Sequence, residues 1–282
     1  MSRLTARAFA GVVACVVLLA TGCVQTPVVG AGTHTGSESA ALGLVNLWRV
    51  SGVAEEEVDT WLRLDAGSFQ LWRDCGMIDG AWRTTETLFL ASTYGAIEDC
   101  VVGGTVPRVE WLEAVTGYRA AGAGWVLTDA NGAVVATLAV DGAPEPIPTA
   151  ATFYAEPPVI TDSVRELMRK PAPLPAEMSP VTAATLAGKW IPLGYVVPTD
   201  PHVVFAEDGT WSGSDGCNAG EGRWVADNAG ALLATTGPMT QIGCEGAPVP
   251  AWLAGVYLAG LDGERLSLLD ADGSEIGWLE RE

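Results

Sequence analysis

The sequence is poor in the residues that most often carry catalysis and metal binding. Only two histidines occur among 282 residues, His34 and His202. A serine or cysteine nucleophile usually needs a neighbouring base, and the chain contains no G-x-S-x-G segment. It also lacks the C-x-x-C pairs that commonly hold zinc. These absences predict a protein that is not an enzyme and needs no cofactor or metal, with His202 an exposed strand residue rather than a catalytic base.

Positive charge is scarce as well. The formal net charge is −19, and Lys170 and Lys189 are the only lysines. An acidic chain is repelled by nucleic acid and by anionic lipid headgroups. This excludes nucleic acid as a partner and argues against membrane docking through a basic patch. The run Glu55–Glu57 could seat a cation, but runs of like charge are more typical of solvated loops.

The N-terminal apolar run, Ala8–Ala20, is too short for a transmembrane helix, which needs about 20 apolar residues. Arg3 and Arg7 precede it and small residues follow it, which is the pattern of a secretory signal. The junction Ala20-Thr-Gly-Cys23 resembles the lipobox of bacterial lipoproteins, with Ala20 where leucine is usual. This resemblance implies a signal peptide over residues 1–22. It also implies a lipid anchor of the palmitate type on Cys23, and a place on the extracytoplasmic face of the cell membrane. The alternative is an ordinary cleaved signal with a chance cysteine.

The six cysteines fit an exported protein. Cys15 lies in the signal and Cys23 takes the lipid, so an even number remains. An even remainder outside the cytoplasm indicates disulfides, whereas buried free thiols would suit a cytosolic chain. The four remaining cysteines are Cys75, Cys100, Cys217 and Cys244.

An internal repeat is the strongest pattern in the sequence. When Trp48 is aligned with Trp190, Cys75 and Cys217 each follow 27 residues later. Collinear matches of this kind indicate two copies of one domain, over residues 40–140 and 181–282. The matched register predicts the disulfides Cys75–Cys100 and Cys217–Cys244, each of which could contribute about 3 kcal/mol. Further matches are Gly80 with Gly222, Trp82 with Trp224, Trp111 with Trp252, and the turns Asp129-Ala-Asn-Gly132 and Asp270-Ala-Asp-Gly273.

Two segments lie outside the copies. Residues 23–39 are rich in Gly, Ser and Thr, and we expect them to form a lipidated tether. Residues 141–180 are rich in proline and favour an extended linker. Within the linker, the spacing of Ser163 and Glu166 predicts a short helix over Thr161–Lys170 that packs on one of the domains.

Each copy is expected to be mainly β, in an α+β arrangement. Short strands separated by glycine turns favour an antiparallel sheet, curled into a partly closed, barrel-like form. Proline-started stretches predict one helix per copy, over Pro107–Tyr118 and Pro250–Leu258. In copy two, Trp190–Val197 is apolar and β-prone but broken by Pro192. The further strands expected there are His202–Phe205, Thr210–Gly213, Gly220–Val225, Ala231–Thr236, Leu266–Leu269 and Ile276–Leu279.

Copy two resembles the META domain of HslJ-like heat-shock lipoproteins. It contains Gly213-Ser-Asp-Gly-Cys-Asn218, which matches that family's G-x-x-G-C-N, and Thr240-Gln-Ile-Gly-Cys244, which matches Thr-x-x-x-Cys. The opening Leu186-Ala-Gly-Lys-Trp190 and the turn Asp208-Gly209 also correspond. Copy one is a degenerate member, with Asp74-Cys75-Gly76 in place of Gly-Cys-Asn and Ala96 in place of the threonine. The resemblance implies a lipid-anchored β domain linked to envelope stress, with no known catalysis.

Two functions are compatible with these patterns. The first is a non-enzymatic envelope lipoprotein that binds an envelope protein or a cell-wall partner, or acts in stress resistance. The alternative is a carrier of small molecules or glycans that uses a barrel mouth. Asn218 and Trp211 are the candidate binding residues. A turn-forming role for Asn218 and a core position for Trp211 are the structural alternatives.

Overall fold

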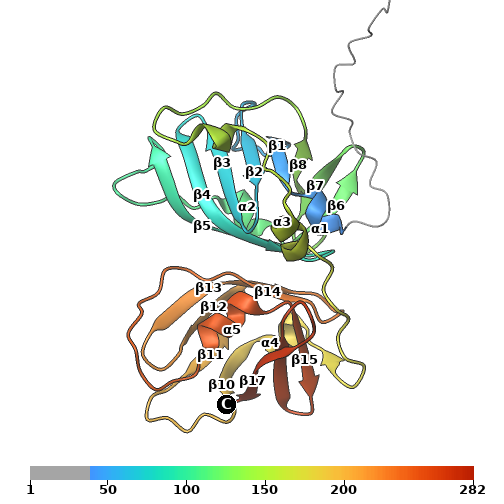
Figure 1. Cartoon of the computed structure of the whole chain (residues 1–282), viewed down its shortest axis with the longest axis vertical. Coiled ribbons are helices and arrows are strands. Elements are labelled where there is room, and N and C mark those ends of the chain that lie inside the picture. Colours follow the sequence, from blue (N-terminus) through green and yellow to red (C-terminus); the bar gives the residue numbers. More distant parts are fainter. Residues whose placement is uncertain (1–38) are drawn as a thin grey trace, which may run out of the picture. The chain divides into compact units, whose positions relative to one another are not determined.

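The first copy forms one antiparallel sheet of eight strands in the structure, a computed structural model that describes residues 39–282 (Figure 1). The strands are β1 (Asn46–Ser51), β2 (Trp61–Leu64), β3 (Ser68–Arg73), β4 (Gly76–Thr84), β5 (Phe89–Glu98), β6 (Gly117–Ala121), β7 (Gly124–Thr128) and β8 (Val134–Ala139). Their order across the sheet is β5-β4-β3-β2-β1-β8-β7-β6.

The second copy forms a second antiparallel sheet with the same order and one added strand. Its strands are β9 (Ser179–Pro180), β10 (Gly188–Pro192), β11 (His202–Phe205), β12 (Thr210–Ser214), β13 (Ala219–Ala226), β14 (Leu232–Ala234), β15 (Leu258–Asp262), β16 (Arg265–Leu269) and β17 (Glu275–Arg281). They are ordered β14-β13-β12-β11-β10-β17-β16-β15-β9. Strand for strand, β1–β8 correspond to β10–β17. The expected fold class and the repeat of two β domains are therefore confirmed.

The helices are short and more numerous than one per copy. Residues 39–282 contain α1 (Ala40–Gly43), α2 (Glu110–Ala114), α3 (Asp162–Leu167), α4 (Ala183–Leu186), α5 (Val249–Gly255) and a 3-10 turn over Thr152–Ala155. The helices α1 and α4, each just before the first strand of its copy, were not expected. In this described part of the chain, no helix has the length and apolar character needed to cross a bilayer.

Each sheet curls without closing. Neither is closed into a barrel. One isolated bridge links the two sides of each curl, Leu88 with Gly117 of β6 in the first sheet and Ala231 with Leu258 of β15 in the second. The concave face of each sheet encloses a core. Trp82, Phe69 and Phe89 fill the first core, and Trp190, Trp211 and Phe205 fill the second. At about 25 cal/mol per Å² of apolar area, such aromatic side chains contribute a large share of the burial free energy.

The repeated tryptophans occupy the same places in both sheets. Trp48 Nε1 donates to the Leu44 carbonyl oxygen at 2.7 Å, and Trp190 Nε1 donates to the Leu186 carbonyl oxygen at 2.7 Å. Each acceptor lies four residues back, at the end of the short helix or just after it. The unexpected helices therefore supply the carbonyl group that a buried indole N–H requires.

The linker packs against the two copies along its length. Its first part covers the second face of the first sheet, where Ile147, Ala150, Tyr154 and Ala155 pack with Trp61 and Trp72. The helix α3 follows, and its residue Val164 and its C-cap residue Met168 pack in the first core. Thr161, rather than Ser163, caps α3 by accepting from the Val164 N–H.

The rest of the linker belongs to the second copy. The Ala172 N–H donates to the Ala271 carbonyl oxygen at 2.9 Å, and β9 pairs with β15. A dividing point near Lys170 therefore describes the contacts better than a free linker over residues 141–180.

The two sheets also contact each other, and residues 39–282 all fall within one compact unit of the chain. Leu88 and Leu90 of the first sheet form a buried apolar cluster with Leu233 of the second. Arg83 of β4 donates hydrogen bonds to three carbonyl oxygens of copy two: Ala234 at 3.0 Å, Leu253 at 3.1 Å and Val256 at 2.7 Å.

Candidate functional site

Two disulfides lie at equivalent places in the two copies. Cys75, in the turn between β3 and β4, is bonded to Cys100, which follows β5, with a Cα–Cα distance of 4.7 Å. Cys217, in the turn between β12 and β13, is bonded to Cys244 in the segment before α5, with a Cα–Cα distance of 6.3 Å. Both pairings predicted from the repeat are confirmed.

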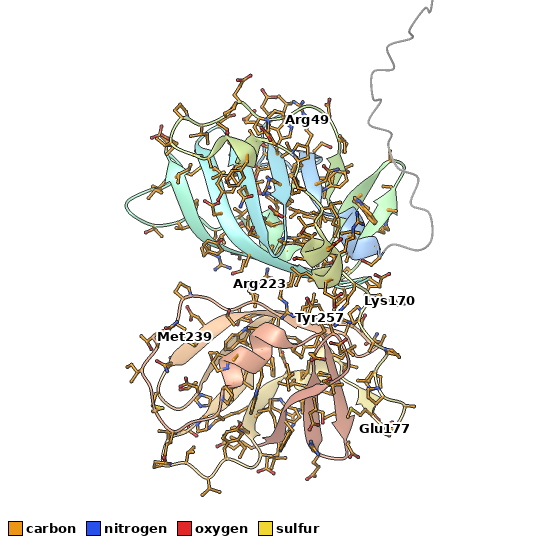
Figure 2. The ribbon with its side chains drawn as sticks, in the orientation of Figure 1. Arg49, Lys170, Glu177, Arg223, Met239 and Tyr257 are labelled. Carbon is orange, nitrogen blue, oxygen red and sulfur yellow. A yellow bond between two sulfur atoms is a disulfide. The ribbon has the colours of Figure 1, made fainter. Side chains whose placement is uncertain are left out.

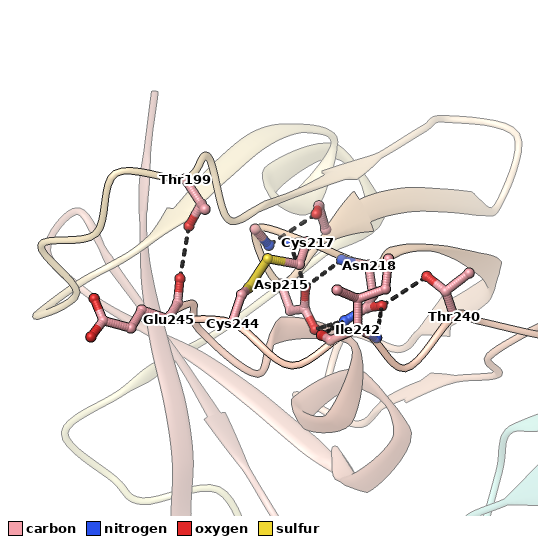
Figure 3. Close-up of a disulfide and its surroundings, with 10 residues drawn as sticks. Thr199, Asp215, Cys217, Asn218, Thr240, Ile242, Cys244 and Glu245 are labelled. Atoms are coloured by element: carbon pink, nitrogen blue, oxygen red, sulfur yellow. Dashed lines mark hydrogen bonds between the residues drawn. A yellow bond between two sulfur atoms is a disulfide. The ribbon is translucent and has the colours of Figure 1, made fainter.

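Asn218 lies at the centre of a polar network beside the second disulfide (Figure 3). Its Nδ2 donates to Asp215 Oδ2 at 2.9 Å and to the Ile242 carbonyl oxygen at 2.8 Å. Its Oδ1 accepts from Thr240 Oγ1 and from the Ile242 N–H, both at 2.7 Å. The side chain is 3% exposed. All of its hydrogen-bonding capacity is thus used inside the domain.

Asp215 is the ionised partner in this network. Burial by itself would raise the pKa of its carboxyl group. Hydrogen bonds from the backbone and side chain of Asn218 and from the Cys217 N–H outweigh that effect, so the pKa is lowered. The carboxylate therefore holds the turn over 215–218 in shape, and its charge is stabilised by the N–H groups that the turn presents.

The first copy has no counterpart of this network. Gly76 follows Cys75 where Asn218 follows Cys217, and its φ of +130° strains any other residue. An added Cβ would lie 2.7 Å from the Ile97 carbonyl oxygen. Ala96, the counterpart of Thr240, packs against the first core instead. Copy one keeps the disulfide and has lost the polar contacts that surround it in copy two.

Trp211, the other candidate binding residue, is also committed to internal contacts. It is 2% exposed, and its Nε1 donates to the Thr235 carbonyl oxygen at 2.8 Å. A ligand would find no free polar atom on Asn218 or on the indole of Trp211. The prediction that they bind a ligand stays a prediction, and their contacts favour the structural alternatives.

Surface clefts do occur, and one lies beside the first disulfide. It has a volume of about 580 Å³, and its floor includes Trp61 and Trp72. The linker forms one wall through Pro144 and Ile147. Acidic side chains surround it: Asp59, Asp74, Glu98, Asp99 and Glu145.

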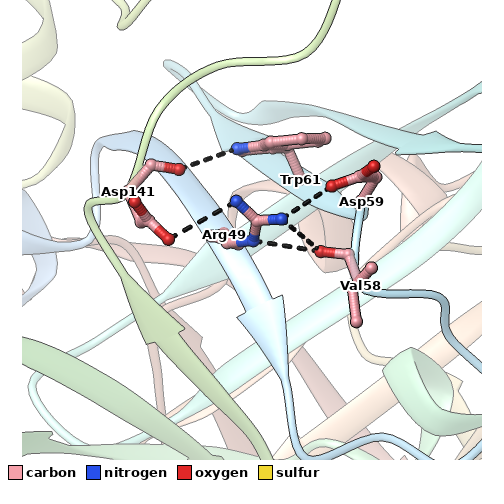
Figure 4. A network of polar contacts seen from close by, with 5 residues as sticks. All are labelled: Arg49, Val58, Asp59, Trp61 and Asp141. Carbon is pink, nitrogen blue, oxygen red and sulfur yellow. Dashed lines mark hydrogen bonds and ion pairs between the residues drawn. The ribbon is translucent and has the colours of Figure 1, made fainter.

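Arg49 neutralises part of this charge (Figure 4). Its guanidinium pairs with Asp59 at 2.7 Å and with Asp141 at 3.4 Å. It also lies 4.8 Å from the ring centroid of Trp61, whose Nε1 donates to the Asp141 carbonyl oxygen. The contacts fasten the start of the linker to the sheet. Trp61 therefore has a structural role in holding the linker, although it does not recur in copy two.

His202 Nδ1 lies 2.8 Å from the Asp200 carbonyl oxygen, and within residues 39–282 no serine or cysteine side chain is hydrogen-bonded to it. Glu55 and Glu57 are exposed in a loop, as expected for the run Glu55–Glu57, but the side chain of Glu56 is buried. It pairs with Arg73 at 2.9 Å and accepts from Trp111 Nε1 at 2.6 Å. Across the described residues, no group of three or more His, Cys, Asp or Glu side chains is placed to hold a metal. Cys15, Cys23 and His34 lie outside the described residues.

Comparisons with known proteins add little. No family model matches the chain, and no curated protein matches it either. Among solved structures, an NMR structure of a protein from Burkholderia xenovorans aligns with 39% of this chain and 93% of its own, at 15% identity. Its TM-score of 0.31 is too low to carry an argument about fold or function.

Replacing Asn218 with alanine should lower the free energy of unfolding of copy two by about 2 kcal/mol, because the Ile242 N–H and carbonyl oxygen lose their partners. The effect should shrink as the pH falls through the lowered pKa of Asp215, since the network needs the ionised carboxylate. Asn228→Ala, in the exposed turn between β13 and β14, is the matched control and should have little effect. Chemical denaturation of both variants measures the difference. Equal stability of the two would contradict the structural role of Asn218.

Proposed function

We propose that the chain is a non-enzymatic lipoprotein, anchored to the membrane through Cys23, whose two META-like domains bind a protein or cell-wall partner outside the cytoplasm. The observation that carries the proposal is that each concave sheet face is filled by the domain's own side chains. Trp82 and Phe69 are 0% exposed, and Trp190 and Trp211 are 2% exposed. A filled interior leaves the outer surface and its loops for recognition.

Two elements of the META-like motif in copy two meet in space, which supports the resemblance. The Gly-Cys-Asn and Thr-x-x-x-Cys segments are joined by the Cys217–Cys244 bond and by the Asn218–Thr240 hydrogen bond. This contact gives a physical reason for both segments to occur together in one sequence. An envelope role in stress resistance follows from the resemblance and belongs to the same proposal.

The disulfides support export. Disulfides persist mainly in oxidising compartments, so both bonds fit a protein outside the cytoplasm. The carrier function through a barrel mouth is less well supported, because neither sheet closes and both interiors are occupied by aromatic side chains.

Changing Cys23 to serine should move the protein from the membrane fraction to the soluble fraction. A diacylated cysteine is a lasting anchor, and serine offers no thiol for acylation. Cys15→Ser is the matched control and should stay in the membrane, since that cysteine lies inside the apolar run. Cell fractionation and intact-mass analysis of the mature protein provide the readouts. Retention of the Cys23 variant in the membrane, together with a wild-type mass lacking acyl chains, would rule out the anchor.

Chemical crosslinking in intact cells tests the binding part of the proposal. The wild-type chain should give a defined crosslinked species that contains a protein or a cell-wall fragment. If only crosslinks within the chain or between its own copies form at all reagent concentrations, partner binding is contradicted.

A further inference from the structure

A second pocket lies where α3, β4 and the second copy come together. Its volume is about 420 Å³. Trp82, Met168 and Tyr257 give it mainly apolar walls, and Leu167 lies on its rim, 43% exposed. Its size falls within the range of about 300–1,000 Å³ that is typical of small-molecule sites.

The pocket has one charged group on its wall, Arg83. The guanidinium donates to the carbonyl oxygens of Ala234, Leu253 and Val256 and lies 4.6 Å from the ring centroid of Tyr257. No carboxylate of the described residues lies within ion-pair distance of it. Its charge is therefore balanced by carbonyl dipoles and an aromatic face rather than by an anion.

The guanidinium of Arg83 therefore has no anionic partner among the described residues. Burial lowers the pKa of Arg83, and only Tyr257 opposes that effect. A cation removed from water is stabilised when an anion with matching hydrogen-bond acceptors reaches it, and guanidinium groups suit carboxylates best. Within residues 39–282, several other arginines already pair with a carboxylate, among them Arg49, Arg63, Arg73 and Arg265.

We propose that this pocket binds an amphipathic monoanion of the fatty-acid type. The carboxylate pairs with Arg83, and the apolar chain lies against Leu167, Ala254 and Tyr257, the last of which is labelled in Figure 2. The strongly negative net charge of the protein repels anions in general. Binding therefore depends on this one arginine and on the apolar walls together. The site lies at the outer boundary of the first core, to which Trp82 and Met168 belong, and it is independent of the proposed partner binding.

The chain offers a matched pair of variants for the test. Ala254 lines the pocket from α5, whereas Ala251, three residues earlier on the same helix, is also exposed and does not line it. Ala254→Trp should fill the pocket, and Ala251→Trp should leave it open. Arg83→Met removes the charge and keeps an apolar side chain of similar length.

The experiment is calorimetric titration of decanoate below its critical micelle concentration and of decanol below its solubility limit. The protein is the full mature chain with Cys23→Ser, which keeps detergent out of the assay. Decanoate should bind saturably with one site, and decanol at least about tenfold more weakly, since a charge-assisted hydrogen bond is lost. Ala254→Trp should weaken decanoate binding about tenfold or more, and Ala251→Trp should match the parent. Arg83→Met should bind decanoate no better than decanol.

Three results would overturn the proposal: no saturable binding of decanoate, equal affinity for decanoate and decanol, or equal affinity of the Ala254 and Ala251 variants. Circular dichroism and thermal unfolding check that each variant is folded. Because Arg83 also joins the two copies, the Ala254 variant decides the matter if Arg83→Met proves unstable.

Discussion

Replacing Trp190 with alanine should lower the free energy of unfolding of the second domain by about 3–5 kcal/mol. The indole is 2% exposed, and its loss leaves a large cavity between β10 and the rest of the core. The Leu186 carbonyl oxygen also loses its hydrogen bond, and the Arg281 guanidinium loses the ring that it covers at 4.5 Å. Truncation therefore removes packing, a buried polar contact and a cation–π contact together.

The repeat supplies an internal check on this prediction. Trp48→Ala should destabilise the first domain by a similar amount, because Trp48 is 3% exposed and makes the equivalent bond to Leu44. Trp278→Ala is the control. This indole is 38% exposed on β17 and contacts Arg265, so its loss should cost about 1 kcal/mol or less. Denaturant unfolding followed by circular dichroism, with hydrogen exchange to assign each domain, measures all three. A Trp190 variant as stable as the Trp278 variant would contradict the shared core.

Much of the fold could be predicted because the two copies constrain each other. Residues that recur at matched spacing, such as Trp82 with Trp224 and Cys75 with Cys217, proved to occupy equivalent positions. Recurrence identifies a buried or bonded residue because burial tolerates few replacements. The hairpin turns at Asp129 and Asp270 were also predictable. In each, the Asp Oδ1 accepts N–H groups two and four residues further on.

Local sequence patterns predicted the element boundaries less well where a strand follows a helix directly. The stretch Pro250–Leu258 was expected to be helical throughout, but α5 ends at Gly255 and β15 begins at Leu258. In the first copy, α2 begins only at Glu110, and Tyr118 lies in β6. Apolar runs of this length suit a buried helix and a buried strand equally well, so tertiary contacts decide between them.

The contacts of the linker could not be derived from its composition. Proline-rich sequence indicates an extended chain and says nothing about which surface that chain covers. Ile147 and Tyr154 have no periodic neighbours, and the partners that bury them, Trp61 and Trp72, lie far away in the sequence. The same reason explains Glu56, whose burial depends on Arg73 and Trp111. Sequence reasoning also gave no signal for the pocket at Arg83, because residues from five separate segments form it.

Replacing Gly222 with alanine should destabilise the second domain by about 3 kcal/mol or more, although only one methyl group is added. An added Cβ would lie 1.9 Å from the Thr235 carbonyl oxygen and 2.7 Å from Trp211 Nε1. The first of these atoms belongs to the backbone, and the second belongs to a buried indole that is hydrogen-bonded to that same carbonyl oxygen. Neither can yield without moving β14 or the core.

Gly243→Ala is the matched control, since no atom lies within 4 Å of its added Cβ and its φ is not positive. It should change stability by less than about 0.5 kcal/mol. Gly80, the counterpart of Gly222, faces Phe69 in the same way, with an added Cβ 2.1 Å from that ring. Gly80→Ala should therefore destabilise the first domain as Gly222→Ala does the second. Denaturant midpoints of the three variants provide the comparison, and a Gly222 variant as stable as the Gly243 variant would show that the strand and the aromatic ring can separate at low cost.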